Sequence, residues 1–167
     1  MSFSASYDRV TKTISTLVCL FLLAIVAATH SFIFCVLAVV LVLVSYAYSP
    51  RGYVIADRSI VVRRLAGRPR IALDDAREVR RATPDDSSGA IRLFGSGGLF
   101  GYYGLFSSAK LGKFTAYVTN RNNKVLVVTG SRTVLFSPDD VNGFLNAIQA
   151  SAPVPSAPTQ SWANGGK

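Results

Sequence analysis

What this 167-residue sequence lacks most clearly is charge over one long stretch: no Asp, Glu, Lys or Arg occurs from Thr13 to Pro50. All 18 basic and 9 acidic residues lie outside it, so an apolar segment is joined to one with the composition of a soluble domain. Both cysteines, Cys19 and Cys35, lie within the uncharged stretch, which excludes a disulfide-rich extracellular scaffold. The polar part is too rich in Val, Ile, Leu and aromatic residues for a disordered chain.

Side chains suited to catalysis or metal binding are also scarce. The single histidine, His30, lies in the uncharged stretch, and the polar part has no cysteine, so nucleophilic and metal chemistry lack their usual groups. Neighbouring residues on a strand point to opposite faces, so adjacent carboxylates suit turns and helix caps better than acid–base catalysis. All three carboxylate pairs are of this kind: Asp74-Asp75, Asp85-Asp86 and Asp139-Asp140. The sequence therefore predicts a non-enzymatic protein with no cofactor and no metal.

The uncharged stretch predicts a transmembrane helical hairpin over residues 13–49. As a single helix, its 38 residues would measure about 57 Å, roughly twice the ~30 Å hydrocarbon core of a bilayer. The polar triplet 29–31 divides it into 13–28 and 32–48, each about long enough for one crossing. His30 in that triplet is either a proton relay or metal ligand, or the tip of the hairpin in the far headgroup layer. We favour the tip, because the spans hold no second histidine and no carboxylate.

The flanking charges predict the orientation of the hairpin. Arg9 and Lys12 precede the first span, and Arg51 and Arg58 follow the second. Positively charged flanks stay in the cytoplasm, so both termini are expected there. The alternative is a signal peptide cleaved near Val26–Ala28, which would leave the second apolar segment as the only anchor.

The polar part has the pattern of an antiparallel sheet followed by one helix. Short apolar segments separated by turn residues predict six or seven strands between Tyr53 and Phe136, joined as hairpins. Ser137 is suited to cap a helix that begins at Pro138. A helix over 138–150 is expected to pack on the sheet, because apolar residues recur along it at helical spacing: Val141, Phe144, Leu145 and Ile148.

Three segments carry a resemblance to a known family. They are IRLFGSGGLFGYYG at 91–104, YVTN at 117–120 and VLFSPDD at 134–140. Over about 53–150 the chain resembles the bacterial PH-like domain family, whose members often carry two membrane spans ahead of the domain. The resemblance implies the pleckstrin-homology superfold, and it implies neither catalytic residues nor a settled ligand.

The expected fold class is membrane-anchored α+β: a two-helix transmembrane hairpin followed by a PH-like antiparallel β-barrel or sandwich, capped by a C-terminal helix. Its parts are a cytoplasmic N-terminus (1–12), the hairpin (13–49), the PH-like domain (50–150) and a disordered tail (151–167).

An excess of arginine follows the second span, with nine arginines against four acidic residues between Arg51 and Arg81. Basic residues beside a membrane gain about 1 kcal/mol each from anionic headgroups. We therefore expect contact with anionic phospholipids at the inner leaflet, although arginines that only enforce topology and solubility would look the same. Nucleic acid is a lesser option, because no aromatic-basic RNA motif occurs. The candidate headgroup residues are Arg51, Arg58, Arg63, Arg64, Arg68, Arg70, Arg80 and Arg81.

The glycine-rich run at 95–104 is the second candidate site. It does not end in the Gly-Lys-Ser/Thr of a phosphate-binding Walker loop, because Leu105 follows Gly104. Its apolar residues form either an exposed tip, which would enter lipid or bind another membrane protein, or a plug folded into the core. The tip suits the alternative function, a protein-interaction scaffold of a membrane complex. These residues are Leu99, Phe100, Tyr102 and Tyr103.

Overall fold

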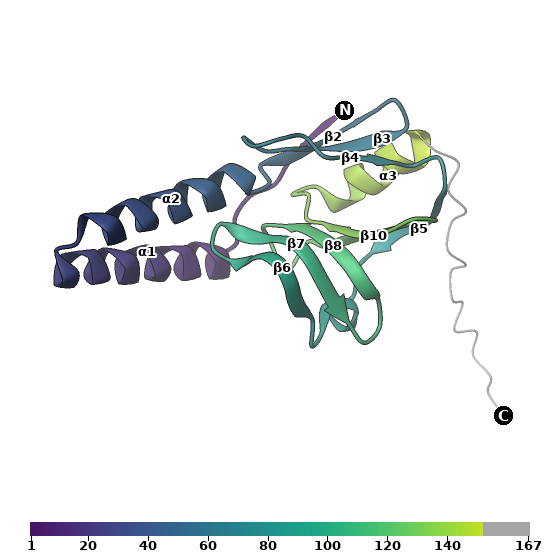
Figure 1. The fold of residues 1–167 in the computed structure, drawn as a ribbon. Helices are drawn as coiled ribbons and strands as arrows, with labels where there is room; N and C mark the ends of the chain where they lie inside the picture. The colour runs from purple at the N-terminus through teal and green to yellow at the C-terminus, as the bar shows by residue number, and fades with distance from the viewer. Residues whose placement is uncertain (152–167) are drawn as a thin grey trace.

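The uncharged stretch folds into two antiparallel helices that project from a β-rich domain in the computed structural model, which describes residues 1–151 (Figure 1). They are α1 (Arg9–Thr29) and α2 (Phe32–Tyr48). His30 ends α1 in a left-handed conformation with φ 47°, and the chain turns within the polar triplet, as predicted. The helix α1 begins four residues before the expected span, because the Asp8 carboxylate caps it by accepting from the Thr11 N–H at 2.7 Å.

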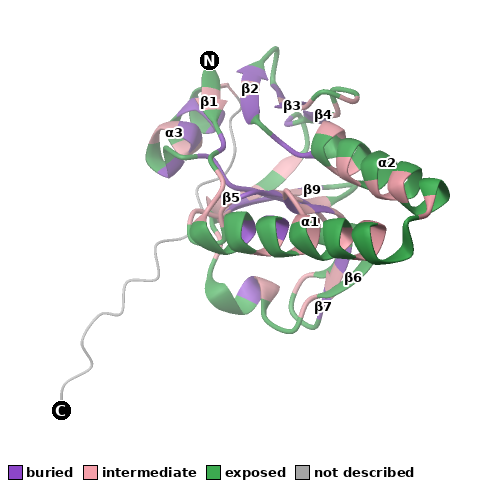
Figure 2. Cartoon of the chain, turned by 90° about the vertical axis from the view of Figure 1, so that its left-hand side faces the viewer, coloured by how far each residue is buried: buried purple, intermediate pink, exposed green. Residues whose placement is uncertain are grey.

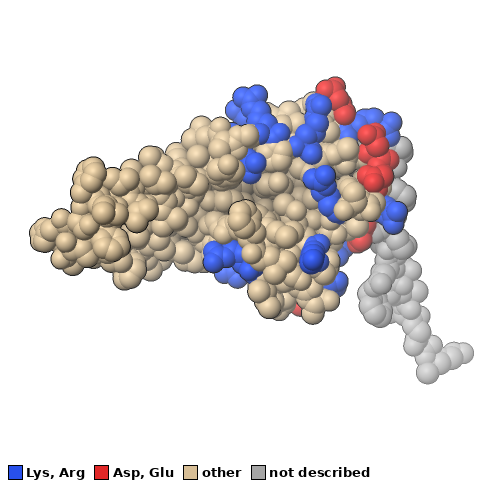
Figure 3. All heavy atoms as spheres, viewed as in Figure 1, with Lys and Arg blue, Asp and Glu red and all other residues tan. Residues whose placement is uncertain are grey.

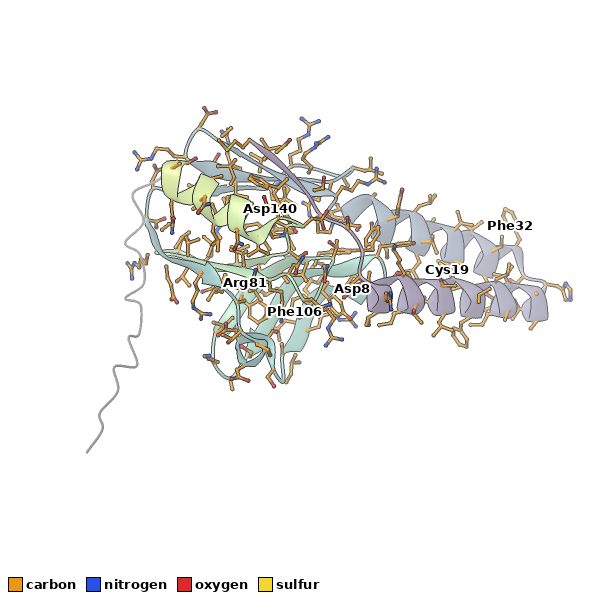
Figure 4. The ribbon with its side chains drawn as sticks, turned by 180° about the vertical axis from the view of Figure 1, so that it is seen from behind. Asp8, Cys19, Phe32, Arg81, Phe106 and Asp140 are labelled. Atoms are coloured by element: carbon orange, nitrogen blue, oxygen red, sulfur yellow. The ribbon has the colours of Figure 1, made fainter. Side chains whose placement is uncertain are left out.

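The two helices are mostly exposed, with half-buried residues interspersed along each of them (Figure 2). No residue of α2 is buried, and only Thr11 and Ser15 are buried in α1. By length and composition, α1 is the one helix among residues 1–151 that could cross a membrane, and the apolar helix α2 is shorter, with 17 residues. Both cysteines line the cleft between the helices, and Figure 4 shows Cys19 there.

A four-stranded sheet follows the helices, with the strand order β1-β2-β3-β4. Its first strand comes from the N-terminal segment, to which the sequence analysis assigned no strand. A Cβ on Gly52 would lie 2.6 Å from the Phe3 carbonyl oxygen, so the glycine lets this strand approach. The two helices are therefore inserted between neighbouring strands of one sheet. The strands are β1 (Ser2–Ser4), β2 (Gly52–Ala56), β3 (Ser59–Arg63) and β4 (Arg70–Ala72).

The second sheet has six strands in the order β5-β9-β10-β8-β7-β6. The prediction that every connection is a hairpin is wrong for three connections. The β4–β5 connection joins the two sheets, and the β5–β6 connection joins opposite edges of the six-stranded sheet. Strand β10 lies between β8 and β9 and runs parallel to β8. The loop between β8 and β9 spans two strand spacings, about 10 Å, which six residues reach easily. Its strands are β5 (Ala76–Arg81), β6 (Ile91–Gly98), β7 (Gly101–Ser108), β8 (Gly112–Val118), β9 (Val125–Thr129) and β10 (Thr133–Phe136).

The C-terminal helix α3 (Val141–Ser151) lies between the two sheets (Figure 1). It begins three residues later than predicted, because Asp140 rather than Ser137 caps it: the Gly143 N–H donates to Asp140 Oδ1 at 2.9 Å. The Ser137 hydroxyl instead accepts from the Thr119 N–H at 2.8 Å, which ties the loop after β8 to the end of β10.

The main core forms where α3 meets both sheets. Phe144 of α3 is fully buried, with its ring centroid 5.7 Å from that of Tyr53 and 5.9 Å from that of Phe136. The buried Tyr53 hydroxyl donates to the Tyr117 carbonyl at 2.5 Å and accepts from the Ser137 N–H at 3.0 Å. Burial raises the pKa of Tyr53 to about 12. The β-sheets with a C-terminal helix agree with the expected α+β domain, and the predicted tail beyond Ser151 lies outside the described residues.

Candidate functional site at the base of the helix pair

The turn between β6 and β7 docks against the ends of both helices nearest the domain. The Ser15 hydroxyl of α1 donates to the Gly98 carbonyl at 3.3 Å and accepts from the Phe100 N–H at 2.8 Å. The hydroxyl of Ser49, which follows α2, donates to the Phe100 carbonyl at 2.6 Å. We call this junction the base of the helix pair: Ser15, Ser45, Tyr46, Tyr48, Ser49 and the turn 98–101.

Glycine is required where the turn touches α1. Gly98 has φ 136°, and a Cβ there would lie 3.0 Å from Ile14 Cγ2 of the helix. The glycine-rich run therefore permits close approach of a strand turn to a helix.

Two aromatic residues of this run, Phe100 and Tyr103, pack on the helices instead of forming a free tip, whereas the Tyr102 ring lies under the Arg121 guanidinium. Tyr103 is buried, with 7% of its surface exposed, and its hydroxyl donates to the Ser45 carbonyl at 2.7 Å. Burial raises the pKa of Tyr103. The ring of the half-buried Phe100 meets that of Tyr46 edge-on, with centroids 5.4 Å apart. Leu99 and Tyr102 are also half-buried, so the set predicted as an interaction tip contacts the chain's own helices and neighbouring strands.

Two of the predicted arginines lie over tyrosines at the end of α2. The Arg51 guanidinium carbon is 4.6 Å from the ring centroid of Tyr46, and that of Arg64 is 5.0 Å from the centroid of Tyr48. Both are cation–π contacts, which hold the guanidinium groups while leaving most of their donors free. Arg64 Nε is shielded from solvent and has no hydrogen-bond partner among residues 1–151. The pair therefore presents unsatisfied positive charge at the base of the helix pair.

A model of one protein family, described as the bacterial PH domain, matches residues 51–152. That span covers most of the chain and includes both sheets except β1, together with the C-terminal helix. The chain belongs to the bacterial PH domain family. No curated protein and no solved structure matches it. PH domains are generally binding modules without catalytic activity. Residues 1–151 of the chain contain no group of three or more His, Cys, Asp or Glu side chains that could hold a metal ion.

Among the other predicted arginines of the PH domain, Arg63 adjoins the base, because its carbonyl accepts from the Arg51 N–H at 2.8 Å, whereas Arg58, Arg70 and Arg80 have partners elsewhere. The β2–β3 register places Gly52 opposite Arg63 and Ala56 opposite Ser59, so the turn holding Arg58 is at the far end of the hairpin from the helices. Arg58 pairs there with Asp74 at 3.1 Å, and Arg70 pairs with Asp57 at 3.5 Å.

Arg80 has a structural role in the PH domain. It donates to Asp86 at 2.6 and 3.1 Å and to Glu78 at 2.6 Å. The guanidinium of Arg80, the Thr83 N–H and the Lys110 ammonium hold the pKa of the fully buried Asp86 carboxyl well below its usual range. The remaining predicted arginines are exposed and take no part in an ion pair among residues 1–151: Arg63, Arg68 and Arg81.

Sequence reasoning missed the polar residues inside and just before the apolar stretch. Ser15 and Ser49 look like tolerated small residues in or beside a membrane span, yet the hydroxyls of both bind the β6–β7 turn. Asp8 accepts from the Arg121 N–H at 3.0 Å and so fixes the loop after β8 beside the start of α1. Serines confined to the ends of the two apolar segments nearest the domain were the available signal.

The surface charges are divided along the long axis of the molecule. On the face in Figure 3 no charged side chain lies on the projecting helices. Basic side chains lie beside the junction and across the domain, and most of the acidic side chains lie toward the end farthest from the helices. This division would direct the basic end of the domain toward a negatively charged surface.

Proposed function

We propose that this protein is a membrane-anchored PH domain whose helices α1 and α2 cross the bacterial inner membrane as a hairpin, with both termini in the cytoplasm. The domain is non-enzymatic and contacts anionic phospholipid headgroups of the inner leaflet through the arginines at the base of the helix pair.

The exposed apolar surface of the helix pair is the observation that carries this proposal. Large side chains near its tip are almost fully exposed, including Phe32 at 82% and Ile33 at 70%. Contiguous apolar surface of this extent marks a membrane or protein contact. Lipid suits it better than water, because a helix satisfies its own backbone hydrogen bonds and these helices carry no charge beyond the base.

The lengths of the helices support headgroup contact. Hydrogen bonds hold Ser15 and Ser45 to the domain, so only Thr16–Thr29 and Phe32–Val44 project freely. Each free segment is about 20 Å long, roughly 10 Å less than the hydrocarbon core. A hairpin that reaches the opposite leaflet therefore draws the base of the helix pair into the headgroup layer, where Arg51 and Arg64 meet phosphate groups.

The contacts of the N-terminal segment speak against the signal-peptide alternative. Strand β1 pairs with β2, and Thr11 and Ser15 are buried against the domain. Cleavage near Val26–Ala28 would remove a strand of the sheet and the helix on which the β6–β7 turn rests.

A protein-interaction scaffold is the second candidate, and strand β6 favours it. This strand lies at the edge of the six-stranded sheet and carries exposed apolar side chains: Ile91 at 69%, Leu93 at 50% and Phe94 at 78%. An edge strand with such side chains is suited to pairing with a strand of another protein.

The headgroup proposal is tested on the full chain in vesicles of mixed zwitterionic and anionic lipid. Extraction with a styrene–maleic acid copolymer retains the surrounding lipids, whose ratio is then measured. We expect anionic lipid to be enriched over the bulk, and the enrichment to fall at high salt. The double variant Arg51→Gln and Arg64→Gln should lose it, whereas the matched control Arg58→Gln and Arg70→Gln should keep it. Equal enrichment in the two double variants would refute the assignment.

A further inference from the structure

A second apolar region lies on the face of the six-stranded sheet away from α3. Neighbouring residues of β9 and β10 point to opposite faces, so Val127 and Val134 join the core beneath α3 while Leu126 and Leu135 face the other side. Phe106 belongs to this second region. Figure 4 shows that Phe106 lies away from α3, whose start is marked by Asp140. The described chain places no helix of more than four residues over this face.

A cavity of about 390 Å³ opens on this face. Its apolar lining includes Phe106, Phe114 and Leu135, which come from three different strands. This volume is within the usual range for small-molecule pockets, which are mostly apolar with a few polar groups that orient the ligand.

Three basic side chains share the lining of this cavity. They are Arg92 on β6 and Arg121 and Lys124 in the loop after β8. None of the ion pairs among residues 1–151 includes any of them, and no acidic residue lines the cavity. The half-buried Lys124 ammonium donates to the Ser87 hydroxyl. Burial, together with repulsion from Arg121, lowers the pKa of Lys124. The nearby Asp86 charge acts on the Lys124 pKa in the opposite direction but does not reverse the shift. Three converging cations with no acidic residue in the lining favour an anion in this cavity.

A groove connects the cavity with the level at which α1 leaves the domain. The groove has a volume of about 1050 Å³, and it shares Ser87, Arg121 and Lys124 with the cavity. Arg9 and Lys12, in the first turn of α1, line its other end. Asp8 also lines the groove, where its carboxylate accepts from the Arg121 N–H. Four basic side chains against this one carboxylate give the groove a net positive charge, which would attract an anionic amphiphile from the membrane surface.

We propose that this cavity binds one single-chain anionic amphiphile, either a free fatty acid or a lysophospholipid. The acyl chain lies against Phe106, Phe114 and Leu135, and the acidic headgroup is held by Arg121 and Lys124. Each methylene group that the cavity buries strengthens binding about fourfold, so affinity should rise with chain length. The site goes beyond the headgroup contact proposed above, because none of its residues belongs to the base of the helix pair.

Native mass spectrometry of the full chain, released from nonionic detergent, tests the proposal by counting bound ligands. The probes are palmitate, palmitoyl-lysophosphatidylglycerol, the neutral palmitoylglycerol, and glycerol phosphate as a headgroup without a chain. We expect a one-to-one complex with palmitate, with the lysophospholipid or with both, and this pattern identifies the source of the chain. Three results would overturn the proposal: palmitoylglycerol binds as well as the anionic probes, glycerol phosphate binds as well as the lysophospholipid that carries an acyl chain, or no probe forms a complex.

Two variants with matched controls locate the site. Lys124→Gln removes the half-buried charge, and Lys113→Gln makes the same change at an exposed position on β8. Ala90→Trp blocks the cavity, and Ala109→Trp places the same ring on the exposed surface. We expect Lys124→Gln and Ala90→Trp each to weaken binding about tenfold or more, with both controls unchanged.

Thermal unfolding identifies any variant that fails to fold. If Lys124→Gln or Ala90→Trp fails to fold, Arg121→Gln is used in its place. Equal binding in a variant and its control overturns the assignment. Changing Arg51 and Arg64 to Gln should abolish lipid enrichment but leave the complexes with palmitate or lysophospholipid intact. The headgroup proposal and the cavity proposal can therefore fail independently.

Discussion

The helices α2 and α3 are both apolar, yet they lie in opposite surroundings. In α3 the apolar side chains form one stripe, and Val141, Phe144, Ala147 and Ile148 are all buried between the sheets. In α2 apolar residues cover the whole circumference, and none of them is buried. A one-sided stripe indicates a helix that packs on a domain in water, whereas an all-round apolar surface indicates a helix whose solvent is lipid. The distribution of apolar residues around a helix therefore predicts its surroundings better than their number.

The largest expected effect comes from truncating one phenylalanine in each helix. Phe144→Ala should destabilise the full chain by about 3–5 kcal/mol, because it leaves a cavity between three aromatic rings and α3. Phe34→Ala in α2 should change the free energy of unfolding by less than about 1 kcal/mol, since its side chain is 49% exposed and exchanges one apolar contact for lipid. Unfolding by denaturant in nanodiscs measures both variants. Similar losses in the two would remove the distinction between the helices.

A smaller effect is expected from the buried carboxylate of Asp86, which has no counterpart in the helix pair. Asp86→Asn should cost about 2 kcal/mol at neutral pH, because hydrogen bonds to Arg80 and Lys110 lose their charge. The folded state lowers the pKa of Asp86, so its contribution is present above about pH 4 and is lost as the pH falls through the folded-state value.

The difference in stability between wild type and Asp86→Asn should therefore shrink on acidification below about pH 4. Unfolding curves between pH 2 and pH 7 measure it. The neighbouring exposed residue provides the control, and Asp85→Asn should stay within about 0.5 kcal/mol of wild type across that range. A constant difference for Asp86→Asn at every pH would contradict the ion-pair explanation.

The smallest effect on stability, and the most direct test of the comparison, comes from labelling the turn between α1 and α2. Ser31→Cys, with Cys19 and Cys35 replaced by Ser, should leave unfolding unchanged within about 0.5 kcal/mol. In spheroplasts an impermeant maleimide added from outside should label this position. A cysteine at Ala109, in the exposed β7–β8 turn, should be labelled only after lysis. Protection of position 31 from the outside would contradict a hairpin that crosses the bilayer.

Local patterns predicted the elements whose cause lies within a few residues. The break at His30 and the apolar stripe of α3 are of this kind. Strand β1 and the insertion of β10 between β8 and β9 depend on contacts between distant segments, such as Thr119 with Ser137 and Phe3 with Gly52, which have no periodic signal.

The candidate site was predicted less completely, because counting arginines does not reveal their partners. Arg80 is held by Asp86, and Arg58 by Asp74, although the sequence gives no sign that these charges meet. Arg51 and Arg64 differ from them only through the tyrosines placed beneath them by the end of α2.

Strand β1 has a mechanical consequence for the whole molecule. One helix leaves the sheet from β1 and the other returns to β2, its immediate neighbour, through connections of only a few residues. The domain is thus connected to the helix pair by two short segments rather than by one long flexible linker, which restricts its rotation about the helix axis. With the helices in a membrane as proposed, the surface that the domain turns toward the lipid is chosen by the fold itself and does not have to be found by diffusion.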